Sequence, residues 1–476
     1  MIHRRRTKIV VTLGPALDNL DVLKKVINAG ADVFRCNFSH GSQEDHQRRI
    51  ESVRKFASDA GREVAIFADL QGPKIRVARF KNKKVFLKQG DEFVLDANLD
   101  TNDGDEKAVG IDYKELPHDV TTNDILLLDD GRIVLCVKEV VGVKIICSVV
   151  VGGELSNNKG INRQGGGLSA KALTDKDKAD LVFATTLGVD YFAISFPRSA
   201  ADMEEAKSLI VDAGSQAGVI AKIERVEAVA ALEEIINASD AIMVARGDLG
   251  VEIGDAELPA VQKHIIKLTR QLNKPVITAT QMMESMIHNS IPTRAEVFDV
   301  ANAVLDNTDA VMLSAESASG DHPDVVVEAM ARICSGAEKN PNVNSVNDRI
   351  EGCNGTIDEA IAMAAMYTAN NEDIKAIIAI TESGHTPLLM SRVRTDIPIF
   401  ALTRNLATQR KVNLYRGVYP LPFDITEVDY ASIDQCAIEV LQQKGILQEG
   451  DLVIVTKGDI IGEHGHTNTM KIWRVE

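Results

Sequence analysis

The sequence predicts an α/β protein: an eight-stranded parallel β/α (TIM) barrel with an inserted all-β lid domain and a C-terminal α/β domain. A chain of 476 residues is long enough for two or three domains. Short apolar, β-branched runs recur along it, and all but one of the intervals between them suit a strand plus a helix. The runs lie at residues 7–13, 32–36, 64–68, 190–195, 219–223, 241–245, 274–278 and 309–313.

The barrel is expected to comprise residues 1–71 and 169–342. These segments hold about 240 residues, close to the roughly 250 that are typical of this fold. A closed barrel leaves no sheet edge exposed, which favours it for eight parallel units, and a doubly wound open sheet is the alternative. The first helix is expected over residues 20–29, with Asp18 as its N-cap and Gly30 after its end.

The one long interval holds the insertion, a β-barrel lid domain expected over residues 72–168. Short segments with alternating apolar residues, beginning with 75–80, are separated by Gly- and Asp-containing turns. The insertion leaves and re-enters at the carboxyl side of the barrel, where active sites of such barrels lie. A mobile lid is the resulting hypothesis, with Gly72-Pro73 and Gly165-Gly166-Gly167 as hinges.

A polar, turn-rich segment, residues 340–356, reads as a linker to the C-terminal α/β regulatory domain, residues 343–476. Apolar runs at 376–380, 398–402, 417–420, 452–456 and 471–475 alternate with helical patterns over 357–370 and 433–444.

Composition limits the function classes. A formal charge of −16 argues against nucleic-acid and anionic-membrane binding. No apolar stretch approaches the roughly 20 residues of a membrane helix, and the N-terminus lacks a signal-peptide pattern. Six scattered cysteines without a C-x-x-C pair fit reduced thiols and a cytoplasmic location.

Charged residues follow the apolar runs, and in a barrel they converge on one mouth. The fifth run leads into Lys222 and Glu224, and the sixth into Arg246 and Asp248. The other runs supply Arg35, Asn37, Ser39, His40, Asp69, Lys74, Arg76, Ser195, Arg198, Thr278, Thr280, Gln281, Ser314 and Glu316.

Glu224 and Asp248 are the predicted Mg²⁺ ligands, because Mg²⁺ takes one or two carboxylates plus phosphate and water. The alternative for Glu224 is a surface ion pair with Lys222 or Arg225. Gly247 could let backbone N–H groups approach an anion, although a plain turn is the default. Arg246 either touches substrate or orients a carboxylate such as Glu224, and we favour the pairing.

Each of two further groups of residues could have either a binding role or a purely structural role. Asn37, Ser39 and Asp69 could bind a cation or form a cap and turn cluster. The loop 381–386 joins an apolar run to a helix start, which is either an anion site or an ordinary capped loop. Nucleotide-binding and kinase glycine motifs are missing from the sequence.

The chain resembles the pyruvate kinase family along essentially its whole length. The resemblance is carried by RCNFSHG, DLQGPKIR, NNKG, AKIE, MVARGDLGVE, ITATQMMESM, PTRAEVFDVANAV and DAVMLSAES, in this order. It implies phosphoryl transfer from phosphoenolpyruvate to ADP, giving pyruvate and ATP, with Mg²⁺ or Mn²⁺ as cofactor. Among family members it looks most like the bacterial form regulated by AMP and sugar phosphates, and it suggests a homotetramer.

The resemblance also implies roles for individual residues. Lys222 would stabilise the phosphoryl and enolate charge, and Glu224 with Asp248 would hold Mg²⁺. Arg35 would contact the phosphoryl group, while Gly247, Asp248 and Thr280 would hold the substrate carboxylate, with Thr280 on the path that protonates the enolate. The nucleotide set would be Asn37, Phe38, Ser39, His40, Arg76 and Lys159, and the monovalent-cation set would be Asn37, Ser39, Asp69 and Leu70.

One departure from the family pattern concerns the monovalent cation. Members that depend on it carry Glu in a GPEIR stretch, whereas this chain has Lys74 in GPKIR. An ammonium near Asn37, Ser39 and Asp69 would repel K⁺ and replace its charge, so activity is expected not to require K⁺. Leu70 stands where Thr is usual, which matters less if the ligand there is a carbonyl.

In this family the third domain binds phosphorylated effectors. The corresponding loops here are 381–386, with Thr381, Ser383, Gly384, His385 and Thr386, and 462–469. His385 is the only residue of the first loop that could become cationic, so phosphate affinity there could depend on pH. Two other functions remain as alternatives: a Mg²⁺-enolate lyase or aldolase, and a non-enzymatic sensor of sugar phosphates.

Overall fold

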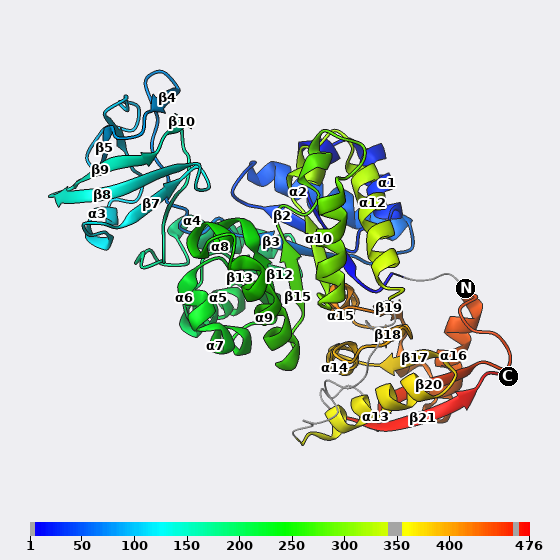
Figure 1. Ribbon diagram of the computed structural model, residues 1–476. Helices are drawn as coiled ribbons and strands as arrows, with labels where there is room; N and C mark the ends of the chain where they lie inside the picture. The colour runs from blue at the N-terminus through cyan, green and yellow to red at the C-terminus, as the bar shows by residue number, and fades with distance from the viewer. Residues whose placement is uncertain (1–4, 341–354, 460–465) are drawn as a thin grey trace.

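Eight short strands form a closed barrel at the centre of the molecule (Figure 1). The computed structural model describes residues 5–340, 355–459 and 466–476. The strand order is β1-β16-β15-β14-β13-β12-β3-β2, and every neighbouring pair is parallel, which excludes the open sheet. The strands are β1 (Lys8–Thr12), β2 (Val33–Asn37), β3 (Ala65–Asp69), β12 (Tyr191–Ile194), β13 (Gly218–Ile223), β14 (Ala241–Ala245), β15 (Val276–Ala279) and β16 (Ala310–Leu313).

Side chains along each strand point alternately into the barrel and out toward the helices, and this determines which residues pack inside the barrel and which lie at its mouth. Inward residues such as Val33, Phe67 and Ile220 are fully buried in one cluster. Outward residues such as Ile9 and Ile66 belong to a second cluster, which the surrounding helices complete. Because side chains alternate between the two faces, Arg35 and Asn37 share the inward face with Val33 and lie above it at the strand end.

Helices cover the outside of the barrel. They are α1 (Leu20–Asn28), α2 (Gln43–Asp59), α4 (Asp175–Thr186), α5 (Ala200–Asp212), α6 (Val226–Ala230), α7 (Leu232–Asn237), α8 (Arg246–Ile253), α9 (Leu258–Gln271), α10 (Arg294–Leu305), α11 (Ala315–Ala318) and α12 (Pro323–Ala337). The expected cap of α1 is wrong by one residue: Asn19 accepts the bond from Asp21 N, while the carboxylate of Asp18 binds Arg49 at 2.7 Å. Gly30 does follow the helix, with φ of 107°.

The insertion is a β half-barrel that stands on one side of the barrel, opposite the C-terminal sheet (Figure 1). It contains β4 (Lys84–Leu87), β5 (Glu92–Asp96), β6 (Ala108–Gly110), α3 (Leu116–Asp119), β7 (Ile125–Leu128), β8 (Ile133–Val141), β9 (Lys144–Val151), β10 (Gly153–Ser156) and β11 (Ile161–Arg163). Six of its strands form one sheet in the order β11-β7-β8-β9-β5-β6, and β10 pairs separately with β4. Residues 75–80 make only isolated bridges.

The glycines at both crossings adopt backbone conformations that other residues rarely take. Gly72 has φ of 66°, and Gly165, Gly166 and Gly167 have φ between 78° and 90°. Barrel side chains hold the returning segment: Arg225 donates to Leu168 O at 3.2 Å, and Glu227 accepts from Gly167 N. Lid movement about these crossings stays a prediction.

The C-terminal α/β domain is a five-stranded sheet in the order β19-β18-β17-β20-β21, with only β21 antiparallel. Its elements are α13 (Ile357–Asn371), β17 (Ile374–Ile380), α14 (His385–Ser391), β18 (Ile399–Thr403), α15 (Leu406–Lys411), β19 (Val418–Pro422), α16 (Ile433–Gln443), β20 (Leu452–Gly458) and β21 (Thr467–Arg474). All five expected runs are strands. The expected linker lies almost entirely outside the described residues.

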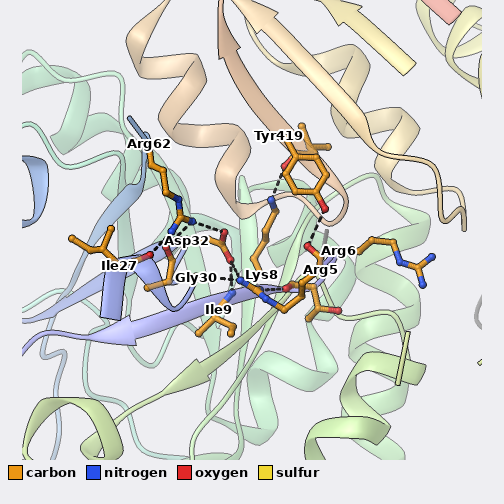
Figure 2. Close-up of polar contacts among 12 residues, drawn as sticks. Arg5, Arg6, Lys8, Ile9, Ile27, Gly30, Asp32, Arg62 and Tyr419 are labelled. Atoms are coloured by element: carbon orange, nitrogen blue, oxygen red, sulfur yellow. Dashed lines mark hydrogen bonds and ion pairs between the residues drawn. The ribbon is translucent and has the colours of Figure 1, made fainter. Parts of the chain in front are cut away.

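A buried cation cluster joins the amino end of β1 to this domain. Figure 2 shows Arg5, Lys8 and Arg62 gathered around Asp32, which also accepts from Ile9 N at 2.9 Å. Lys8 is 1% exposed; its ammonium donates to Val418 O at 2.5 Å and lies 4.5 Å from the Tyr419 ring centre. Burial lowers the pKa of Lys8 to about 8, with Asp32 opposing and the two arginines reinforcing this shift.

We predict that Lys8 makes stability rise with pH in the alkaline range. The unfolded chain keeps the lysine proton up to about pH 10.5, so between about pH 8 and that value it binds more protons than the folded protein. Urea unfolding at about pH 7.5 and about pH 9.5 should show a gain of about 2 kcal/mol in the wild type beyond that of Lys8→Met. Equal pH dependence in both proteins would contradict the burial of a titrating Lys8.

Candidate active site

Lys222 lies at the centre of the mouth, near the end of β13. Its ammonium is 2.9 Å from Glu224 Oε1 and 3.1 Å from Asp69 Oδ1, and it donates to Ser195 Oγ at 2.7 Å. Burial opposes the charged form, but the two carboxylates outweigh it and raise the pKa of Lys222 above its usual value. Lys222 is therefore a permanent, desolvated positive charge at the carboxyl end of the barrel.

Arg35 of β2 supplies a second cation at the mouth and contacts residues of the two adjoining strands, β1 and β3. Its Nε is 2.6 Å from Asp69 Oδ2, and its Nη1 donates to Thr12 Oγ1 at 3.3 Å. Asp69 is 1% exposed; burial acts to raise its pKa, but Lys222 and Arg35 overcome that effect and lower it. Asp69 is thus an ionised carboxylate that positions both cations.

The two predicted metal ligands follow β13 and β14. Glu224 is 1% exposed, and its Oε2 accepts from Phe196 N at 2.8 Å, where Phe196 has φ of 56°. Burial raises the pKa of Glu224, Lys222 opposes this, and the negative charge of Asp248 adds to it. Both carboxylates thus belong to the same mouth, where each is also paired with a lysine: Glu224 with Lys222 and Asp248 with Lys74.

Lys74 pairs with a residue of the barrel mouth. Its ammonium, expected near Asn37, Ser39 and Asp69, is 3.0 Å from Asp248 Oδ1. Asp69 is engaged by Arg35 and Lys222, whereas the Asp248 side chain is partly exposed and pairs with Lys74. Lys74 therefore enters the mouth as expected but pairs with a predicted metal ligand.

The start of α8 forms a donor surface beside these carboxylates. Gly247 lies in its first turn, and its N–H donates to Thr280 Oγ1 at 2.8 Å, with Thr280 at φ of 67°. An N-terminal turn of a helix is a favourable place for an anion. The expected pairing of Arg246 with Glu224 is wrong: its Nη1 binds Asp299 at 2.7 Å, and its Nη2 donates to Thr280 O at 2.6 Å. Arg246 thus fixes the Thr280 backbone.

The predicted nucleotide residues come from β2 and from the insertion. Asn37 begins a turn in which its Oδ1 accepts from Ser39 N at 3.1 Å. Burial and the nearby cations Arg76, Arg35 and Lys74 lower the pKa of His40, so the insertion carries its cations to this turn. Arg76 donates to Asn158 O at 2.9 Å, while Lys159 pairs with Asp129 at 2.7 Å within the insertion.

The predicted monovalent-cation oxygens already accept hydrogen bonds within the protein. Leu70 O accepts from Ser195 Oγ at 2.7 Å, Asn37 Oδ1 from Ser39 N, and Asp69 Oδ2 from Arg35. The structure thus brings Asn37, Asp69 and Leu70 to adjoining strand ends, where Asp69 is the one of the three that pairs with protein cations, Arg35 and Lys222.

The predicted effector loop lies far from the mouth, between β17 and α14. Gly384 takes φ of 81° and donates to Thr381 Oγ1 at 3.0 Å, and Thr386 Oγ1 is 2.7 Å from Thr467 Oγ1. His385 Nε2 is 3.4 Å from Asp358 Oδ2 of α13. The first half of the second loop, residues 462–465, lies outside the described residues.

Some contributors to the site were missed by sequence reasoning. Ser195 links Lys222 to the Leu70 carbonyl, the Phe196 N–H holds Glu224, and Asp299 anchors Arg246. Ser195 was visible at a strand end but carried no assigned role. The Phe196 N–H and the Asp299 carboxylate of α10 could not be identified from the sequence, because their roles depend on contacts between elements that are distant in the chain.

Comparisons with known proteins agree with this architecture. The family model described as pyruvate kinase, barrel domain, matches residues 4–327, and pyruvate kinase, alpha/beta domain, matches residues 359–473. Pyruvate kinase II of Salmonella typhimurium is 58% identical over 99% of both chains. Pyruvate kinase of Haemophilus influenzae is 56% identical over 95% of this chain and 96% of its own. That of Geobacillus stearothermophilus is 41% identical over 98% of this chain and 80% of its own.

The chain has a parallel barrel with an inserted β half-barrel, and its mouth holds an ion-paired lysine and two carboxylates. With the family match, these features place it among the divalent-metal-dependent phosphotransferases. The chain belongs to the pyruvate kinase family. It transfers the phosphoryl group of phosphoenolpyruvate to ADP, giving pyruvate and ATP. This activity excludes both the lyase or aldolase and the non-enzymatic sensor. No helix of the described residues is long and apolar enough to span a bilayer.

Proposed function

We propose that two pairs of charged residues at the barrel mouth carry out this transfer. Lys222 and Arg35 bind the phosphoryl group, and Glu224 and Asp248 bind Mg²⁺ or Mn²⁺. The supporting observation is the position of the Lys222 ammonium, which two carboxylates hold at 2.9 and 3.1 Å in a buried site. There it neutralises negative charge that develops on the phosphoryl oxygens and on the enolate oxygen as the P–O bond breaks.

The residues at the mouth fit a divalent metal. Among the described residues, no group of three or more His, Cys, Asp or Glu side chains is arranged to hold a metal ion. Two carboxylates that leave the remaining positions to substrate oxygens and water are what Mg²⁺ commonly uses. When bound, the metal would supply further neutralisation of phosphoryl charge. Lys74, now on Asp248, would then be released toward the nucleotide side.

The start of α8 suits the substrate carboxylate. The N–H groups of Gly247 and Asp248 lie at a helix N-terminus, and Thr280 Oγ1, which now accepts from Gly247 N, is positioned by its backbone contact with Arg246. Binding of the carboxylate would take over the Gly247 N–H and free the Thr280 hydroxyl. That hydroxyl would then lie on the path by which a proton reaches the enolate carbon.

ADP and ATP are proposed to bind between the turn 37–40 and the insertion. Asn37, Phe38, Ser39 and His40 supply the turn, and Arg76 and Lys159 supply cations from the insertion. The contact that supports this is the ion pair of Lys74, at the start of the insertion, with Asp248 of the barrel mouth, which brings the insertion to the mouth.

Independence from K⁺ is a prediction that follows from Lys74. The ammonium already supplies positive charge within the mouth, 3.0 Å from Asp248. Turnover in sodium-only or tetramethylammonium-only buffer should remain within about threefold of that in K⁺, whereas Lys74→Glu should need added K⁺. Near-zero wild-type turnover that K⁺ restores would contradict this prediction.

Regulation is proposed to resemble that of the type activated by AMP and sugar phosphates, with the loop 381–386 as effector site in a homotetramer. The supporting contact is between His385 Nε2 and Asp358 Oδ2, 3.4 Å apart, which holds the ring at the start of α14, where a cationic side chain could face a phosphoryl group. Activation by ribose 5-phosphate and by AMP should weaken as pH rises from about 6 to about 8, through the usual histidine range.

The measurement is the phosphoenolpyruvate saturation curve with and without each effector across that pH range. His385→Ala should bind effector more weakly at the acidic end, about tenfold, and should lose most of the pH dependence. Identical profiles for wild type and His385→Ala would remove His385 from effector binding.

A further inference from the structure

The first turn of helix α4 lies against the segment where the chain leaves the barrel for the insertion (Figure 1). Asp177 in this turn is fully buried, and its Oδ1 accepts from Gly72 N at 3.0 Å. Gly72 lies between β3 and the insertion, whereas α4 is the first barrel helix after the chain returns. One side chain therefore connects the departing segment to the returning one, across 105 positions of the chain.

Asp177 also has an ordinary role at the start of its own helix. Its Oδ2 accepts from the N–H of Thr174 at 2.9 Å and from the Thr174 hydroxyl at 2.6 Å, so the two residues form a capping box. The corresponding acids of α2 and α5, Asp45 and Asp202, accept bonds from residues within four positions of themselves. The bond from Gly72 is therefore additional to what a helix cap needs.

Gly72 lies between two contacts of the catalytic mouth. Two positions before it, Leu70 O accepts from Ser195 Oγ, which also accepts from the central lysine of the mouth. Two positions after it, Lys74 pairs with Asp248 at 3.0 Å. The Gly72 backbone is packed against the barrel, because a Cβ at this position would lie 2.7 Å from the Cβ of Ser195. The position of the Gly72 N–H thus helps to determine where the insertion enters the mouth.

The same turn of α4 also contacts the barrel side of the proposed nucleotide site. Lys176, next to Asp177 in the chain, donates to Phe38 O at 2.8 Å. Phe38 belongs to the turn 37–40, and the insertion supplies Arg76 on the opposite side. Two consecutive residues of one helical turn therefore hold the barrel part of the proposed nucleotide site and the start of the insertion.

We propose that Asp177 is a positioning residue for phosphoryl transfer: through Gly72 it aligns the start of the insertion with the turn 37–40, so that the cations of the insertion meet ADP. This role rests on the proposed nucleotide site. A hydrogen bond from an N–H to a carboxylate is stronger than one between neutral groups, and small displacements of aligned groups reduce catalysis strongly. Phosphoenolpyruvate is proposed to bind to residues of the barrel, so its binding should depend less on Asp177.

The test compares steady-state kinetics of Asp177→Ala and Thr174→Val. Asp177→Ala removes the bond to Gly72, and its KM for ADP should rise at least about tenfold while the KM for phosphoenolpyruvate stays within about twofold of wild type. Thr174→Val is the matched control, because it removes the hydroxyl bonds of the same cap but leaves the Asp177 carboxylate to accept from Gly72. An unchanged KM for ADP in Asp177→Ala, or an equal rise in Thr174→Val, would overturn the proposal.

A second measurement uses the unmodified protein. Hydrogen exchange resolved to single amides should show the Gly72 N–H exchanging at least about a hundredfold more slowly than an unprotected amide, and exchange at the unprotected rate would also overturn the proposal. Arg76→Met tests the nucleotide site by itself and should raise the KM for ADP. An unchanged KM for ADP in Arg76→Met, together with a raised one in Asp177→Ala, would contradict the assignment of Arg76 to the nucleotide and still support the positioning role of Asp177.

Discussion

Lys222→Met should lose turnover by at least about a thousandfold while its phosphoenolpyruvate KM changes little. The ammonium is desolvated and directed at the region where phosphoryl and enolate charge develops, and removal of one such charge in a water-poor site costs several kcal/mol of transition-state stabilisation. Steady-state pyruvate formation from phosphoenolpyruvate and ADP measures the effect.

The loss has to be separated from a loss of folding. Removal of Lys222 leaves Asp69 with Arg35 but deprives Glu224 of its cation, so some destabilisation is expected as well. Circular dichroism and urea unfolding should show a folded enzyme under assay conditions. Lys178→Met, which breaks an exposed pair with Glu205 at 2.9 Å, is the control and should keep wild-type turnover. Turnover within about tenfold of wild type in Lys222→Met would remove Lys222 from the proposed role.

Glu224→Gln should raise the Mg²⁺ concentration needed for half-maximal turnover by roughly a hundredfold. The amide has almost the same shape and still accepts from Phe196 N, so the change removes mainly the negative charge of a metal ligand. Turnover as a function of free Mg²⁺, and separately of free Mn²⁺, measures the shift.

Glu316→Gln is a suitable control for this substitution. Glu316 is also buried at a strand end, accepts from Ser314 N at 2.6 Å, and has a pKa raised by burial, yet nothing places it on the metal. Its metal dependence should match that of the wild type. Unchanged metal dependence in Glu224→Gln would show that Glu224 serves only to position Lys222.

The barrel was predictable because each of its strands is buried on both faces and therefore reads as an apolar run. The mouth followed from geometry: parallel strands end together, so Arg35, Asp69, Lys222 and Glu224 had to converge once closure was assumed. The strand order of the insertion, β11-β7-β8-β9-β5-β6, was not predictable, because it depends on pairing between strands that are distant in the sequence.

The errors concern the choice among nearby partners. Arg246 was expected to orient a carboxylate such as Glu224, and the carboxylate that it pairs with is Asp299 of α10. Asp18 and Asn19 are both suitable caps, and the contact between Asp18 and Arg49 decides between them. Each choice depends on tertiary contacts that sequence spacing does not contain.

The most direct test of the proposed roles compares Mn²⁺ binding by two variants, Lys222→Met and Glu224→Gln, using electron paramagnetic resonance. It asks whether Lys222 acts on the phosphoryl group while Glu224 acts on the metal. Lys222→Met should bind Mn²⁺ as tightly as the wild type or more tightly, because a cation has been removed beside Glu224, while it no longer transfers the phosphoryl group. Glu224→Gln should bind Mn²⁺ roughly a hundredfold more weakly. Equal loss of Mn²⁺ affinity in both variants would contradict the assignment of Lys222 to the phosphoryl group and Glu224 to the metal.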